Sequence, residues 1–179
     1  MITSTQPNSW DLIQPGDHLI YNSMKDLVDW GIMLKTGSPA CHIEICIAPG
    51  KAVAARNGIG VDDYPLRKEG LAWILRPKSP LDITSGLEWF YRSAHGQKYG
   101  WAELFNFWLP FSDLPSDGMI CSTFAAFFGD ACGFEAFNQN YDHNKISPAD
   151  YTKSGAFDWV WTKFPTKTQK ARRDKSAGL

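Results

Sequence analysis

The segment formed by residues 41–47 constrains the fold more than any other part of the chain, because polar and apolar residues alternate through it without a break. A period of two is typical of a β-strand whose two faces meet different surroundings. One face carries three isoleucines, and the other carries a histidine, a glutamate and a cysteine: Ile43, Ile45 and Ile47 against His42, Glu44 and Cys46. The backbone of such a strand needs hydrogen-bonding partners, so the sequence predicts a sheet here.

Further short segments of strand character surround this strand, at residues 17–21, 52–56, 59–64 and 71–75. The dipeptide Asn57-Gly58 predicts a tight hairpin between the two middle segments. Helical spacing of apolar residues occurs once in this half, over residues 23–35, and Gly37 predicts its end. The first half is therefore expected to be a meander of antiparallel strands with one inserted helix.

Helical patterns dominate the second half, at residues 82–95, 101–108 and 119–132, with a short helix from Ser147-Pro148 and a last strand at 157–161. A serine cap followed by proline at the first helical position is a typical helix start. The predicted class is α+β, a small antiparallel sheet packed against helices.

The charge of the chain is unevenly distributed. Residues 163–179 contain six basic residues and one acidic residue, a net charge of +5, so the body carries −6 of the overall −1. We expect one catalytic domain over residues 1–162 and a basic, disordered tail over 163–179. A basic tail can contact an anionic surface, but the acidic body argues against nucleic acid as the main partner.

No apolar stretch is long enough to cross a bilayer, and the first ten residues lack the features of a secretory signal. The default expectation is a cytoplasmic protein with reduced thiols, with export by another route left open. The four cysteines form no Cys-x-x-Cys pair, so neither a metal nor another cofactor is expected.

Cys121 is the candidate nucleophile because it falls in the first turn of a predicted helix. The positive end of the helix dipole and the unpaired N–H groups there are expected to lower the pKa of the thiol and to hold an oxyanion. A buried cysteine packed as a small apolar residue is the equally weighted alternative. Cys132, at the other end of the helix, and Cys46, on the strand, are weaker candidates.

His42 is the candidate general base, since a thiol nucleophile needs an imidazole within hydrogen-bond reach. Glu44 lies two residues further along and faces the same side, so it can orient the ring as the third member of a catalytic triad does. A structural role for both residues stays open. His18 lies on the first predicted strand, and His95 and His143 fall in loop sequences expected at the surface.

The order of these segments resembles a known group of enzymes. The segments that carry the resemblance are Pro15-Gly-Asp17, Ser38-Pro-Ala-Cys-His42-Ile-Glu44, Gly58-Ile-Gly-Val61, Gly96-Gln-Lys-Tyr99, Ile120-Cys121-Ser-Thr123 and Ile146-Ser-Pro-Ala-Asp150. Over residues 13–161 the chain resembles the permuted papain-like cysteine hydrolases of the NlpC/P60 superfamily, namely the YiiX-like group and, more distantly, the lecithin retinol acyltransferases. The resemblance implies a circularly permuted papain-like fold with Cys121 as nucleophile and His42 as base.

Two positions depart from the pattern of this family. Relatives often carry a polar residue about twelve positions after the histidine, where this chain has Ala54, and a glutamate two positions after the nucleophile, where it has Thr123.

The resemblance implies hydrolysis of an amide in a peptide, of cell-wall type, through a Cys121 thioester. A lipid acyltransferase or thioesterase of the lecithin retinol type, and an inactive binding module on the same fold, remain the alternatives.

Overall fold

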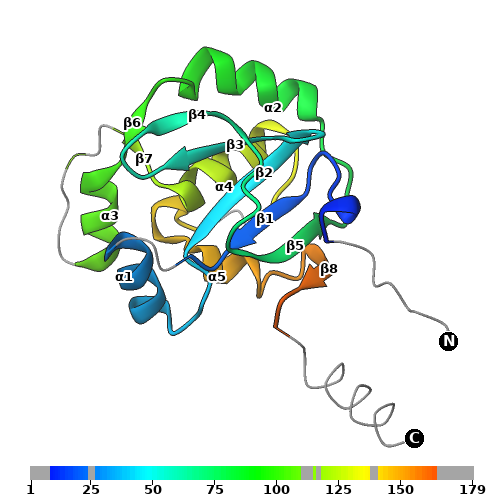
Figure 1. Ribbon diagram of the computed structural model, residues 1–179. Coiled ribbons are helices and arrows are strands. Elements are labelled where there is room, and N and C mark those ends of the chain that lie inside the picture. The colour runs from blue at the N-terminus through cyan, green and yellow to red at the C-terminus, as the bar shows by residue number, and fades with distance from the viewer. Residues whose placement is uncertain (1–8, 24–26, 110–114, 116–117, 138–140, 165–179) are drawn as a thin grey trace, which may run out of the picture.

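The computed structural model describes residues 9–23, 27–109, 115, 118–137 and 141–164. It is an α+β structure built on a six-stranded antiparallel sheet, in the order β4-β3-β2-β1-β5-β8 (Figure 1). The strands are β1 (His18–Tyr21), β2 (His42–Ala48), β3 (Lys51–Arg56), β4 (Gly60–Pro65), β5 (Leu71–Pro77) and β8 (Phe157–Thr162). A small antiparallel sheet with helices was predicted, and the structure confirms this class.

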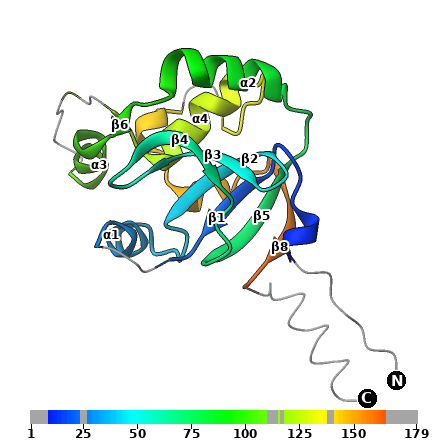
Figure 2. The same ribbon diagram turned by 45° about the horizontal axis from the view of Figure 1, so that its top comes forward.

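Helices surround the sheet unevenly. They are α1 (Leu27–Thr36), α2 (Ile83–Trp89), α3 (Trp101–Trp108), α4 (Cys121–Ala131) and α5 (Pro148–Tyr151), with a π-helical turn at Phe90–Ala94 and short 3-10 turns at Ser9–Leu12 and His143–Lys145. α4 packs across β2 and β3, and α2 packs on α4 (Figures 1 and 2). α1 and α3 lie beside each other at one end of the sheet (Figure 2). Residues 165–179 of the predicted tail lie outside the described residues.

The alternation in β2 places Ile43 and Ile45 on one face and Cys46 on the other, as predicted, and each face meets its own apolar cluster. Ile43 and Ile45 join the main core, which lies between the sheet and α4. Cys46 joins a smaller cluster on the opposite face, together with Leu19 and Tyr21 of β1. β2 is therefore covered on both faces, which is why even its polar residues are buried.

The first predicted strand takes a central position in the sheet. β1 pairs with β2 on one side, where Tyr21 lies opposite His42, and with β5 on the other. Gly16 permits the turn that precedes β1, because its φ of 93° lies in the region that favours glycine. β1 thus holds the beginning of β2 in place, where His42 lies.

A second, parallel pair of strands lies next to the start of α4. β6 (Lys98–Tyr99) pairs with β7 (Gly118–Met119), and only Ile120 separates β7 from α4. The backbone packs tightly here: a Cβ on Gly118 would meet the carbonyl group of Lys98. This pair, which the sequence did not predict, sets the position from which α4 begins.

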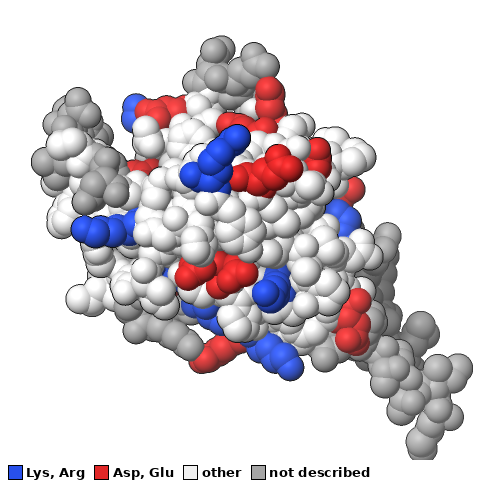
Figure 3. Space-filling view, turned by 90° about the horizontal axis from the view of Figure 1, so that it is seen from above, with Lys and Arg blue, Asp and Glu red and all other residues white. Residues whose placement is uncertain are grey.

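Charged side chains are scattered over the face shown in Figure 3, with lysine and arginine lying close to aspartate and glutamate. The view shows small groups of each sign separated by uncharged surface. The described part of this face therefore offers no broad basic area of the kind that nucleic-acid binding requires.

Candidate active site

Cys121 is the first residue of α4, as the sequence predicts, and its side chain is only 2% exposed. Ile120 before it is extended and forms the N-cap without a side-chain hydrogen bond. The first turn is anchored by Ser122, whose hydroxyl donates to the carbonyl of Ile146 at 2.6 Å and whose own carbonyl accepts from the Tyr151 hydroxyl at 2.9 Å. These buried bonds fix the start of the helix and with it the position of the sulfur.

The Cys121 sulfur lies against the beginning of β2. It accepts hydrogen bonds from the backbone N–H groups of Ile43 and Ser122, and both bonds lower the pKa of the thiol. Burial acts in the opposite direction and is the larger effect, so the pKa of Cys121 is raised to about 12. The expectation that the helix start lowers the pKa of this thiol is therefore wrong for the free protein, because desolvation outweighs the dipole. A base must remove its proton at neutral pH.

His42, the first residue of β2, lies next to the residue that contacts this sulfur. Its Nε2 atom is 3.1 Å from Oε1 of Glu44, so the predicted contact of these two side chains is present. Its ring faces the ring of Tyr21, with 5.9 Å between the centroids. No described residue forms a hydrogen bond with Nδ1 of His42.

The His42 imidazole and the Cys121 sulfur lie on different sides of β2. The side chain of Ile43 faces α4 and the main core, so the pleat directs the neighbouring His42 toward the opposite face, where Tyr21 lies. No hydrogen bond joins the His42 ring to Cys121 among the described residues. The structure thus brings His42 together with Glu44, and Cys121 together with the backbone of Ile43.

Glu44 is a fully buried carboxylate held by two arginines. Its Oε1 atom accepts from Nε of Arg56 at 3.0 Å and lies 3.6 Å from Nε of Arg67. Burial by itself raises the pKa of Glu44, but the hydrogen bonds and charges of His42 and Arg56 outweigh it and lower the pKa to about 2. Since Glu44 is ionised, Nε2 of His42 carries the hydrogen at this contact, and in the neutral form of the ring Nδ1 has the lone pair that a general base needs.

Sequence reasoning missed both arginines. Arg56 stacks over the Tyr64 ring at 3.9 Å, and Arg67 stacks over the Tyr21 ring at 4.4 Å. The period of β3 offered one signal, because Arg56 lies two residues after Ala54 and so faces the same side. Ala54 itself is fully buried, and the cation that completes this polar cluster comes from the next inward position of the strand.

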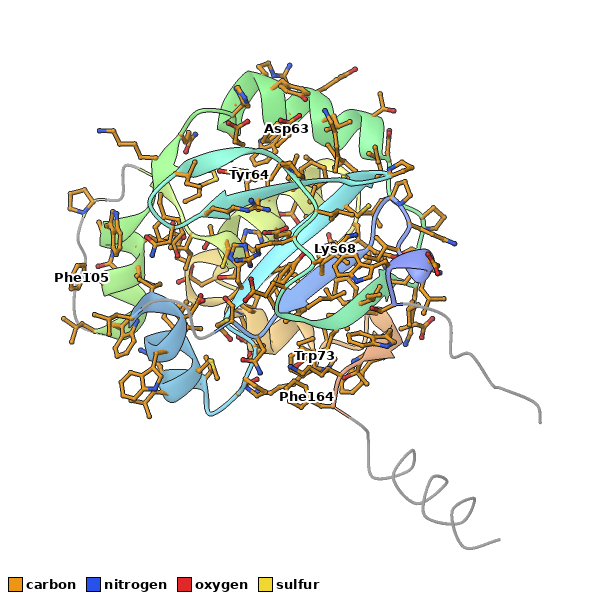
Figure 4. All side chains as sticks on the ribbon, viewed as in Figure 1. Asp63, Tyr64, Lys68, Trp73, Phe105 and Phe164 are labelled. Atoms are coloured by element: carbon orange, nitrogen blue, oxygen red, sulfur yellow. The ribbon has the colours of Figure 1, made fainter. Side chains whose placement is uncertain are left out.

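Apolar space adjoins the nucleophile on its other side. A cavity of about 10 Å³ touches Cys121, and Ile32, Leu104 and Ile120 are among its lining residues. Leu104 also lines a groove of about 330 Å³ between α1 and α3. The remaining lining residues of the groove are apolar as well: Leu27, Val28, Trp101, Phe105, Trp108 and Leu109. Phe105 lies on α3 at the edge of the molecule (Figure 4).

The other candidates occupy separate places. His18 is buried with Nδ1 3.1 Å from the carbonyl of Gly16, and burial lowers its pKa to about 4. The two predicted surface histidines are partly exposed and lie beside carboxylates, His95 beside Asp62 and His143 beside Asp130. Cys46 and Cys132 are buried free thiols, and burial raises their pKa values to about 11 and about 12.

No helix within the described ranges has the length and apolar character needed to cross a membrane. Among the same residues, no three His, Cys, Asp or Glu side chains are grouped so that they could hold a metal ion.

Comparison with known proteins adds no relative. No protein-family model matches the chain, and no curated protein matches it.

Proposed function

We propose that the protein is a cysteine-dependent acyl hydrolase of the permuted papain-like type, with Cys121 as nucleophile, His42 as general base and Glu44 as the residue that orients the base. One observation carries the proposal. A buried His42–Glu44 pair, in which no described residue binds Nδ1 of the histidine, flanks Ile43, whose N–H contacts the sulfur at a helix start. This combination supports an active site more strongly than a buried cysteine alone does.

The reaction begins with removal of the thiol proton. Nδ1 of His42 accepts that proton while the Cys121 sulfur forms a bond with the carbonyl carbon of an amide or ester. The tetrahedral intermediate then collapses: the bond to the leaving group breaks, and the leaving group takes the proton from His42. Water, activated by His42, attacks the thioester and releases the acid together with the free thiol.

This sequence requires the His42 ring and the sulfur to approach each other when substrate binds. Catalytic hydrogen bonds are often long or poorly aligned before the substrate is bound. The ring is held through Nε2 by Glu44 and has no second hydrogen bond to a described residue. Bringing Nδ1 to the sulfur therefore requires the side chain to leave its place beside the Tyr21 ring, and the contact of Nε2 with Glu44 must lengthen or break as it moves.

The start of α4 supplies the groups that stabilise the oxyanion. The first hydrogen bond of the helix runs from the Phe124 N–H to the carbonyl of Ile120. The N–H groups of Cys121 and Thr123, which precede it, have no acceptor within the helix. In the proposed mechanism they donate to the oxyanion as its negative charge develops.

The resemblance favours a peptide amide of cell-wall type as the substrate. The groove between α1 and α3 supports a second candidate, an acyl ester or amide, because its described lining is apolar and Leu104 lines both the groove and the cavity at Cys121. A volume of about 330 Å³ lies in the range of small-molecule sites. The described residues that line the groove offer no charged side chain to a polar peptide.

A substrate comparison tests the proposal. The protein is incubated with soluble peptidoglycan fragments and, separately, with phosphatidylcholine vesicles, and the released products are identified by mass spectrometry. We expect product with one class, and none from Cys121→Ala. Cys132→Ala, which removes another buried thiol of the same helix, should retain activity. Product release that persists in Cys121→Ala would refute the mechanism, and silence with both substrates would favour a binding module.

A further inference from the structure

A buried carboxylate from another helix contacts the residue next to the nucleophile. Glu103 is the third residue of α3 and is only 3% exposed. Its Oε2 atom accepts a hydrogen bond of 3.1 Å from the backbone N–H of Ile120. Ile120 is the N-cap of α4, so this bond ends one residue before Cys121.

Burying the Glu103 carboxylate costs free energy of desolvation, and the hydrogen bonds of its described neighbours offset only part of this cost. Its Oε1 atom is buried and has no hydrogen-bond partner among the described residues. Burial raises the pKa of Glu103, and the nearby Thr123 hydroxyl and the Ile120 N–H oppose this without reversing it. A carboxylate placed at such expense requires an explanation at the atoms it contacts.

The way in which helix N-termini are usually capped explains the contact of Glu103 with Ile120. In a capping box, a glutamate at the third helical position reaches back to the N–H of the N-cap residue. In α4 that third position is Thr123, whose hydroxyl instead donates to the carbonyl of His143 at 3.1 Å. The N-cap is Ile120, which has no polar side chain. α4 therefore lacks both local capping groups, and Glu103 provides from α3 the oxygen that a local glutamate would provide.

The backbone around Glu103 packs closely against its carboxylate, which contacts Ile120. A Cβ on Gly100 would come within 2.8 Å of Oε2 of Glu103. The same Gly100 donates its N–H to the carbonyl of Met119 at 3.1 Å, next to Ile120. α3 and the segment that precedes α4 are therefore joined at two consecutive backbone positions.

We infer that Glu103 is a positioning residue for the nucleophile: it holds the N–H of Ile120 and so fixes where α4 begins and where the Cys121 sulfur lies relative to β2. The inference rests on the proposed function. When the carboxyl is ionised, it also interacts favourably with the positive end of the α4 dipole. The residue does not touch substrate, and its effect reaches the reaction through the backbone.

The test separates the acceptor oxygen from the charge. Glu103→Gln keeps an oxygen that can accept from Ile120, whereas Glu103→Leu fills a similar volume without an acceptor. Two quantities are measured, the exchange rate of the Ile120 amide hydrogen and kcat with KM on the substrate identified above. We expect Glu103→Leu to speed amide exchange at least tenfold and to lower kcat at least tenfold with KM changed less than threefold. Glu103→Gln should stay within threefold in both, as should the exposed control Glu88→Leu.

Gly100→Ala offers a second perturbation if Glu103→Leu does not fold, because its Cβ would come within 2.8 Å of Oε2 of Glu103 and within 3.0 Å of the Gly118 backbone. It should speed exchange of the Ile120 amide in the same direction. Unchanged exchange in Glu103→Leu, or in Gly100→Ala, would overturn the inference, and so would equal losses of kcat in Glu103→Gln and Glu103→Leu. Amide exchange does not depend on turnover, so it decides whether Glu103 holds the start of α4 even if the chain proves to be inactive.

Discussion

Replacing Glu44 by glutamine gives a sharp prediction, because the change keeps the shape of the side chain and removes its charge. The pKa of Glu44 falls from an ordinary 4.5 to about 2 in the folded protein. At about 1.4 kcal/mol per pH unit, ionised Glu44 contributes about 3 kcal/mol to folding at neutral pH. Glu44→Gln should lose about this amount, since it leaves the largely buried Arg56 without its counter-charge.

The pH dependence of this loss follows from the direction of the shift. Because the pKa is lower in the folded state, the contribution is complete above about pH 4.5 and disappears as the pH falls toward 2. At pH 3 about 40% of it should remain. The difference in unfolding free energy between wild type and Glu44→Gln should therefore shrink from about 3 kcal/mol at pH 7 to little more than 1 kcal/mol at pH 3.

Urea unfolding at both pH values, followed by tryptophan fluorescence, measures the difference. The exposed Glu88→Gln serves as the control and should change the free energy by less than about 0.5 kcal/mol at either pH. A difference for Glu44→Gln that is below about 1 kcal/mol at pH 7, or that is equal at the two pH values, would refute the reasoning about this buried cluster.

Two further predictions concern the core. His18 is buried with its pKa lowered to about 4. As the pH drops from about 6.5 to 4, the unfolded chain binds a proton at this histidine and the folded protein does not, so the free energy of unfolding should fall. His18→Phe should remove that part of the pH dependence in urea unfolding, and an unchanged pH profile would contradict the lowered pKa of His18. A Cβ on Gly86 would overlap Cys132 and Phe128, so Gly86→Ala should lower the free energy of unfolding by about 1–3 kcal/mol, measured by thermal unfolding. A Cβ on Gly155 would meet nothing within 4 Å, so Gly155→Ala should be neutral. Equal unfolding midpoints for the two variants would argue against close packing of α2 on α4.

The alternation of β2 was readable from the sequence because a strand has a fixed period. It correctly separated Ile43 and Ile45 from Cys46, and it placed His42 and Glu44 on one face. The start of α4 at Cys121 was readable for a similar reason, since an apolar helical stripe follows a polar loop. Both are local signals.

The remainder depends on contacts between distant parts of the chain. Nothing local indicates that β1 lies between β2 and β5, because strand pairing is set by the packing of the whole sheet. β6 and β7 contain two residues each, too few to show a period. Arginines are usually exposed, so the period of β3, which places Arg56 on the same face as Ala54, was too weak a signal to predict the contact of Arg56 with Glu44.

The same dependence on distant contacts explains why the pKa of the Cys121 thiol was predicted with the wrong sign. A helix start predicts a lowered pKa for Cys121, and the N–H groups that cause this effect are present. How deeply the side chain is buried depends on α1, α3 and α5 together, and that burial determines the sign of the result.

Intact-mass spectrometry after brief mixing with a p-nitrophenyl acyl ester tests the pairing of His42 with Cys121 most directly. The account predicts one acyl group per chain, mapped to Cys121 by peptide sequencing, and acylation slowed by about 10²–10⁴-fold in His42→Ala, the usual contribution of a general base. Acylation of Cys132 or Cys46 instead, or a rate that His42→Ala leaves unchanged, would contradict it.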